Sequence, residues 1–225
     1  MRAHVEALFT HDDAGRMLNV NEPGGKAAPR FFIGRTAHGK KWRVRHDIDD
    51  STRRELELVS IAEPAGEELL VSAHGSTPYE NILIRVEPIR RIWSGPAYAF
   101  PDDLPVAPLA VAISEANRDL LRPHLDAWLG DIAIGQPLIA CVVGGHAVSV
   151  CCTVRKTATA HEAGVETVPE HRGRGYAAQA VAAWARAVRD IGRVPLYSTS
   201  WQNHASQALA ARLGLVRFGA DLHIT

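Results

Sequence analysis

The sequence has few cysteines and no metal-binding spacing. Three cysteines, Cys141, Cys151 and Cys152, occur in 225 residues, which is too few and too odd a number for a disulfide framework. Neighbouring residues on a strand point to opposite faces, so Cys151 and Cys152 cannot enter one site, and we expect each cysteine to be a small buried hydrophobe. Neither Cys-x-x-Cys nor His-Glu-x-x-His occurs, so no bound metal is expected.

Long apolar runs and an excess of one charge are also missing. The longest apolar runs, residues 105–113 and 137–143, fall far short of the roughly 20 residues that span a membrane. No secretory signal is visible at the N-terminus, which predicts a cytoplasmic protein without membrane contact. The 25 basic and 25 acidic residues cancel, which argues against a generally basic nucleic-acid binder but allows a local patch.

The chain has the composition of a globular protein with a buried core, 46% hydrophobic and 22% charged. Three prolines fall within residues 101–108, and proline stops helices and cannot donate to a sheet ladder. We therefore divide the chain into a small α+β domain of unknown role, residues 1–105, and a second domain, residues 106–225.

In residues 1–105 we expect a hairpin of strands 30–35 and 41–45 around His38-Gly39, then a helix capped at Asp49–Ser51 that ends at 61 or 62 before Pro64. Residues 82–86 and 92–98 are predicted as further strands. A set of basic residues interleaved with aromatics lines a polar cleft or forms the solvated face of a sheet. These residues are Arg30, Arg35, Arg43, Arg45 and His46.

In the second domain, residues 106–225, the sequence predicts the element order β-α-β-β-β-α-β-α-β. This order indicates an α/β (α+β) fold, a mixed sheet with helices packed on it. The expected elements are a strand at 111–113, a helical stretch from Ser114 to Gly130 that Pro123 kinks or splits, strands 137–143, 147–155 and 160–168, a helix 174–191, a strand 195–200, a helix 206–213 and a strand 215–224.

One segment carries chemistry, the loop that joins strand 160–168 to the helix after it. It holds Gly173 and Gly175, which let a polyanion approach the main chain, and the helix start offers free N–H groups and a positive dipole end. Together these features predict a pyrophosphate cradle; the alternative is a glycine-rich turn that only joins strand to helix. No Lys follows as in a P-loop, and Ala178 stands where a dinucleotide fingerprint needs its third glycine.

The run Arg172-Gly-Arg-Gly-Tyr-Ala177 resembles the acetyl-CoA signature of the GNAT superfamily of N-acetyltransferases, [Gln/Arg]-x-x-Gly-x-[Gly/Ala]. The run 196–215 resembles a second motif of that family, with Asn203 after a strand and Leu213-Gly214 at the end of the next helix. The resemblance covers residues 110–225, about half of the chain. It implies a GNAT-like, mainly antiparallel mixed sheet flanked by helices.

The resemblance also implies acetyl-CoA as co-substrate and assigns its site. The main chain of residues 165–167 would hold the pantetheine arm, the loop 172–177 the pyrophosphate, and Asn203 the arm from the other wall. An amine would attack the thioester directly, a backbone N–H near Val165 would stabilise the oxyanion, and CoA would leave as thiolate. The implied binding residues are Val165, Glu166, Thr167, Arg172, Gly173, Arg174, Gly175, Tyr176, Ala177 and Asn203.

Attack requires a neutral amine, and therefore a general base or a water that relays the proton. Strand 160–168 offers His161, Glu162 and Glu166, of which we prefer Glu162; the alternative is that these are ordinary polar residues of a strand surface. Ala210 stands where the family often has a tyrosine that protonates the thiolate. A water, Tyr197 or His204 takes that role, or no acid is needed.

The favoured function is acetyl-CoA-dependent N-acetylation of a primary amine on a small molecule or peptide. The alternative is a catalytically weak or inactive acetyl-CoA-binding regulatory module. A third hypothesis, acetylation of an amine carried by aminoacyl-tRNA, needs a basic surface at 30–45, and nucleic acid is the less favoured partner. The amine, the oligomeric state and the role of residues 1–105 stay open.

Overall fold

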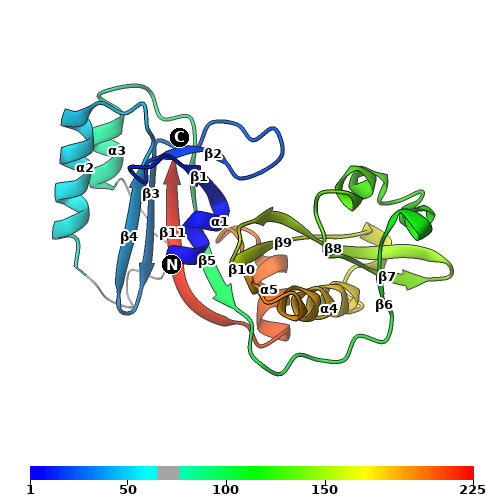
Figure 1. Cartoon of the computed structure of the whole chain (residues 1–225). Coiled ribbons are helices and arrows are strands. Elements are labelled where there is room, and N and C mark those ends of the chain that lie inside the picture. Colours follow the sequence, from blue (N-terminus) through cyan, green and yellow to red (C-terminus); the bar gives the residue numbers. More distant parts are fainter. Residues whose placement is uncertain (65–76) are drawn as a thin grey trace. The chain divides into compact units, whose positions relative to one another are not determined.

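The structure, a computed structural model, describes residues 1–64 and 77–225. Two compact units contain residues 1–98, 198–204 and 217–225, and residues 99–197 and 205–216. The first unit holds α1 (Arg2–Leu8), β1 (Phe9–His11), β2 (Met17–Val20), β3 (Phe31–Thr36), β4 (Gly39–Val44), α2 (Asp50–Ala62), α3 (Pro78–Leu83), β5 (Ile92–Ala99) and β11 (Val216–Ile224) (Figure 1). The second holds β6 (Ala110–Ala112), the 3₁₀ helices η2 (Glu115–Leu121) and η3 (Asp126–Ile132), β7 (Leu138–Val143), β8 (His146–Lys156), β9 (Ala160–Thr167), the 3₁₀ turn η4 (Pro169–His171), α4 (Tyr176–Asp190), β10 (Val194–Ser198) and α5 (His204–Arg212).

The first unit is built on strands in the order β4-β3-β11-β5. Successive side chains of β3 point to opposite faces of the sheet, so they pack in two different core layers. Phe31 and Ile33 pack with α2 and α3, while Phe32 packs with α1, β1 and β2. The predicted hairpin is confirmed, since β3 pairs antiparallel with β4 from Phe31↔Val44 to Thr36↔Gly39.

Helix α2 is confirmed at both ends, and Asp49 caps it by accepting from Thr52 N–H at 2.9 Å. The strand at 92–98 is confirmed as β5, whereas the strand predicted at 82–86 is wrong. Residues 78–83 form helix α3, because Thr77 and Glu80 make a capping box and Pro78 suits the first turn.

Two of the basic residues predicted to form a polar cleft or a solvated face, Arg30 and Arg35, are instead engaged inside the first unit, while Arg43 lines a hollow. Arg30 is buried and donates to the carbonyls of Leu83 and Glu87. Arg35 holds Glu63 through two hydrogen bonds of 2.7 and 2.9 Å. These two arginines therefore stabilise the fold of the first unit.

In the second unit the strands follow the order β10-β9-β8-β7-β6, antiparallel except for the parallel pair β9–β10. Helix α4 covers one face, with Val181, Trp184 and Val188 fully buried, and η2 and η3 lie over the other (Figure 1). The mixed, mostly antiparallel sheet flanked by helices confirms the predicted fold class. Pro123 does split the stretch after Ser114, but into two 3₁₀ helices and not α-helix.

All three cysteines are buried and unpaired, as predicted. Gly144 and Gly145 form the β7–β8 turn with φ of 59° and 86°, the left-handed conformation that tight hairpins require.

The proline-rich stretch before β6 is bound to α4 by hydrogen bonds from two arginines of that helix. Arg189 donates to the carbonyls of Phe100, Pro101 and Asp102, and Arg186 donates to those of Leu104 and Pro105. The last strand, β11, pairs with β3 in the first unit. The boundaries of these two units therefore differ from the predicted boundary at residue 105. That residues 1–105 form a separate domain stays a prediction.

Candidate active site

Strands β9 and β10 run side by side over only three residue pairs. Ala160, His161 and Glu162 pair with Val194, Pro195 and Leu196. Beyond Glu162 the ladder has no further pair in the described parts of the chain, although β9 continues to Thr167 and β10 to Ser198. The second unit therefore carries a strand edge, residues 163–167, that its parallel neighbour leaves open.

The hydrogen bonds around β9 decide which backbone groups face this open edge. Val168 N–H donates to Val148 O on β8, and the carbonyl of Glu166 accepts from Ser149 Oγ, also on β8. Backbone groups of successive strand residues alternate between neighbours, so those of Val165 and Thr167 point away from β8 toward the open edge. Arg172 Nε already donates to the Thr167 carbonyl at 3.2 Å.

The open edge leads into the glycine loop. Gly173 and Gly175 have φ of 74° and 86°, a region that side chains disfavour, and Gly175 is the N-cap of the 15-residue helix α4. A glycine cap offers no side-chain acceptor to the first-turn amides, which stay available to an anion. Arg172 and Arg174 are exposed on the same loop. This geometry fits the diphosphate of a nucleotide-like ligand.

Arg212 at the end of α5 also reaches this loop. A Cβ placed on Gly175 would lie 2.7 Å from Arg212 Nη2 and 3.1 Å from its Cζ. The sequence analysis missed this residue, because only the folding of α5 brings position 212 next to position 175.

The preferred base candidate, Glu162, and its neighbour His161 lie on opposite faces of β9. The register shift in the β8–β9 pair falls between Thr153 and Arg155 on β8, so β9 alternates regularly. Glu162 is 2% exposed and stands opposite Arg155 in register. Cross-strand neighbours of this kind interact on one face of a sheet.

His161 belongs to the face that α4 covers. Its Nδ1 lies 3.2 Å from Thr153 Oγ1, which also accepts from Trp184 Nε1 of α4 at 3.1 Å. Burial lowers the pKa of His161 below 6.5, and the charges of Lys156 and Arg193 lower it further.

Glu166, the third candidate, is exposed and shares the face of Glu162 and Gly164. Trp128 of η3 donates from Nε1 to Glu166 Oε2 at 2.5 Å. A Cβ on Gly164 would meet the Trp128 ring at 3.4 Å. Trp128 therefore forms a wall over this face, a feature that no motif in the sequence indicated.

The remaining candidates lie around the start of α5. Asn203 directly precedes this helix and belongs to the first unit, where its N–H donates to Ser200 O. Ala210 is fully buried. Ser206, one turn before Ala210, lies with its Oγ 2.6 Å from the Tyr197 hydroxyl.

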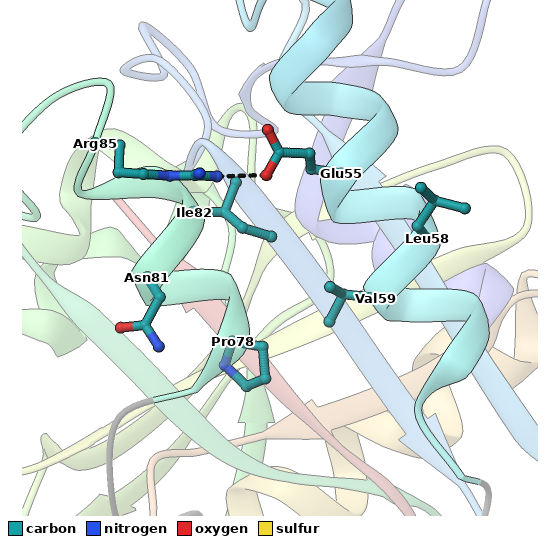
Figure 2. A pocket seen from close by; sticks show the side chains of 7 residues that line it. All are labelled: Glu55, Leu58, Val59, Pro78, Asn81, Ile82 and Arg85. Atoms are coloured by element: carbon teal, nitrogen blue, oxygen red, sulfur yellow. Dashed lines mark hydrogen bonds and ion pairs between the residues drawn. The ribbon is translucent and has the colours of Figure 1, made fainter.

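Elsewhere, the first unit has an open hollow of about 570 Å³ between α2 and α3, shown in Figure 2. Leu58, Val59 and Ile82 give it apolar walls, and Glu55 and Arg85 form an ion pair at one end. The described residues include no group of three or more metal-binding side chains placed to hold an ion. Among the described helices none is long and apolar enough to cross a membrane.

Residues 139–219 match a family model described as GNAT acetyltransferase. The second unit has the GNAT fold. Among solved structures, a GNAT-family acetyltransferase described from Novosphingobium aromaticivorans is 22% identical with a TM-score of 0.50, over 60% of this chain and 65% of that one. A GCN5-related N-acetyltransferase from Kribbella flavida is 16% identical with a TM-score of 0.50, over 99% and 92%. A comparison with curated protein sequences found no match. At these identities the GNAT structures establish the fold alone.

Proposed function

We propose that this GNAT-fold protein is an acetyl-CoA-dependent N-acetyltransferase that acts on a primary amine of a small molecule or peptide. The observation that carries the proposal is the open edge of β9, which starts where the β9–β10 ladder ends and leads to the loop of Gly173 and Gly175. The pantetheine arm of acetyl-CoA fits the open edge, and its diphosphate fits the loop. The two parts follow one another in the ligand in the same order as the edge and the loop do in the protein.

The binding roles follow from the backbone directions. Val165 and Thr167 present main-chain groups to the arm, whereas Glu166 turns its carbonyl to Ser149 and contributes its side chain. Residues 172–177 hold the diphosphate, since the left-handed Gly173 and Gly175 let it approach the main chain at the start of α4. A contact of Asn203 with the arm stays a prediction from the resemblance.

The chemistry is a direct displacement. The nitrogen lone pair of the amine attacks the acetyl carbonyl, the Val165 N–H stabilises the oxyanion, and the C–S bond then breaks with its electron pair on sulfur. Glu162 takes the amine proton as general base. His161 is less suited, because its Nδ1 is engaged by Thr153 and its protonation is disfavoured; we assign it a structural role.

Tyr197 is the candidate that replaces the tyrosine missing at 210. Its hydroxyl contacts Ser206 on α5. Ala210 lies one turn after Ser206 on the same face of this helix, so the phenol of Tyr197 still reaches the face on which the tyrosine would lie. It would protonate the leaving thiolate. We expect Tyr197→Phe to lower kcat with little change in KM for the amine.

The test of the function is an assay with acetyl-CoA and a panel of small-molecule and peptide amines, in which free CoA thiol is detected. Glu162→Gln should lower kcat by about 10² to 10⁴, the usual contribution of a general base. Glu115→Gln, which removes an exposed carboxylate of the same unit that pairs with Arg118, is the control and should retain wild-type activity. Binding of acetyl-CoA without turnover of any amine class would favour the regulatory module instead.

The regulatory module is supported by one observation, the fully buried Ala210 in place of the usual tyrosine. Acetylation on tRNA has less support, because Arg30 and Arg35 are engaged in the first unit by carbonyls and by Glu63.

A further inference from the structure

Arg212 is the last residue of α5 and lies against the loop that caps α4. Its guanidinium occupies the space that a side chain at Gly175 would fill, with Nη2 2.7 Å and Nη1 3.5 Å from the ideal Cβ position. Both residues belong to the second unit. A cation from a distant part of the sequence is thus held at the start of a helix.

The donors of Arg212 are not used by the protein. Arg212 ends α5, and in the parts of the chain that the structure describes its side chain has neither an ion pair nor a hydrogen bond. Other arginines of the second unit do have partners: Arg118 pairs with Glu115, and Arg189 donates to three carbonyls. An exposed guanidinium without a carboxylate keeps its full charge available to a ligand.

The surroundings are those of an anion site. The amides of the first turn of α4 and its positive dipole end point into the loop. Two further exposed cations, Arg172 and Arg174, belong to it, against one carboxylate, Glu170. A planar guanidinium matches two phosphate oxygens at once, which a lysine ammonium does not.

We propose that Arg212 binds the diphosphate of the CoA moiety at the Gly175 loop, as a positioning residue for the cofactor arm. The inference rests on the proposed function, which supplies a diphosphate ligand. It also gives Gly175 a second role, because a side chain there would push the guanidinium off the phosphates.

The test is binding of three ligands to wild type and to Arg212→Gln. By calorimetry, affinity for CoA and for 3′-dephospho-CoA should fall by about 10- to 100-fold, the range of a charge-assisted hydrogen-bond pair. Affinity for pantetheine, which has no phosphate, should be unchanged in an NMR titration. Arg212→Lys should restore part of the loss.

Arg118→Gln is the matched control, since it removes an exposed arginine of the same unit that has its own carboxylate; its CoA affinity should equal wild type. Equal thermal unfolding of all variants shows that the fold is intact. Unchanged CoA affinity in Arg212→Gln overturns the inference and leaves the proposed function standing. A loss for CoA that is absent for 3′-dephospho-CoA overturns the assignment to the diphosphate, and a wild type that binds no CoA overturns both proposals.

Discussion

Among single residues, Gly175 has the most demanding position in the candidate site. Its φ of 86° disfavours any side chain, and the space beside it is filled by Arg212. A flexible arginine can move aside, so the cost to folding comes mainly from the backbone. The cost to binding comes from the displaced cation.

We therefore expect Gly175→Ala to lower the free energy of unfolding by only about 1 kcal/mol, the cost of a left-handed non-glycine residue, but to weaken CoA binding at least tenfold. Urea unfolding and calorimetry measure the two effects. Gly192→Ala is the matched control, because Gly192 has φ of 72° with open space around it. It should lose similar stability and keep wild-type affinity; equal loss of affinity in both variants would contradict the assignment.

His161 makes the free energy of unfolding depend on pH. Burial holds the pKa of the folded state below 6.5, so below that pH the unfolded chain binds more protons than the folded one. Stability from this residue is therefore intact above about pH 6.5 and is lost as the pH falls.

His161→Gln keeps a hydrogen-bonding group near Thr153 but cannot titrate. Unfolding free energies at pH 7.5 and pH 5 should differ less in this variant than in wild type. An unchanged difference would show that His161 is protonated as easily in the fold as in the unfolded chain.

Among the elements, helix α1 is tied to β11 by one buried hydrogen bond between His4 and Asp221. His4 Nε2 lies 2.6 Å from Asp221 Oδ2 of β11, and both side chains are at most 1% exposed. Burial would raise the pKa of Asp221, but His223 and His4 lower it well below its usual value. This pair ties the first helix to the last strand within the first unit.

His4→Ala leaves Asp221 as a buried charge without this partner, and should lower the free energy of unfolding by about 3 kcal/mol. Arg2→Ala on the same helix removes an exposed ion pair with Glu6 and should change it by less than about 0.5 kcal/mol. Chemical denaturation of both variants measures the difference; equal effects would mean that α1 is held by apolar packing alone.

Strand β9 separates its candidates by alternation. Because the irregularity lies on β8, Glu162, Gly164 and Glu166 share one face under Trp128, and His161 takes the other under Trp184. Glu162 and His161 therefore cannot both meet an amine that approaches over a given face.

Across the whole molecule, the first unit is closed by residues from the far end of the sequence. Strand β11 lies between β3 and β5 in the sheet order and buries Leu222 and Ile224 in the core with α2 and α3. Each such side chain contributes roughly 1.5 to 3 kcal/mol by burial. The first 105 residues by themselves lack this strand.

We expect a fragment of residues 1–105 to show no cooperative unfolding by circular dichroism. Adding a peptide of residues 216–225 should restore structure in a concentration-dependent way, since it supplies the pairing and the apolar side chains, and a scrambled peptide should not. A fragment that unfolds cooperatively without the peptide would support the division at residue 105.

The sequence by itself determined the parts that depend on neighbours in the chain. The cap at Asp49, the hairpin around His38-Gly39 and the glycine loop before α4 were predicted because caps and turns are decided within a few residues. The error at 82–86 is also local, since the Thr77–Glu80 capping box starts a helix at Pro78.

Only the tertiary structure decided which distant residues meet. Arg212 reaches Gly175, Trp128 covers β9, and β11 enters the first unit, in each case through packing between elements far apart in sequence. No periodicity or spacing encodes such contacts, because they depend on how whole faces are buried against one another. The glycine loop was therefore predictable, and the arginine that completes its charge was not.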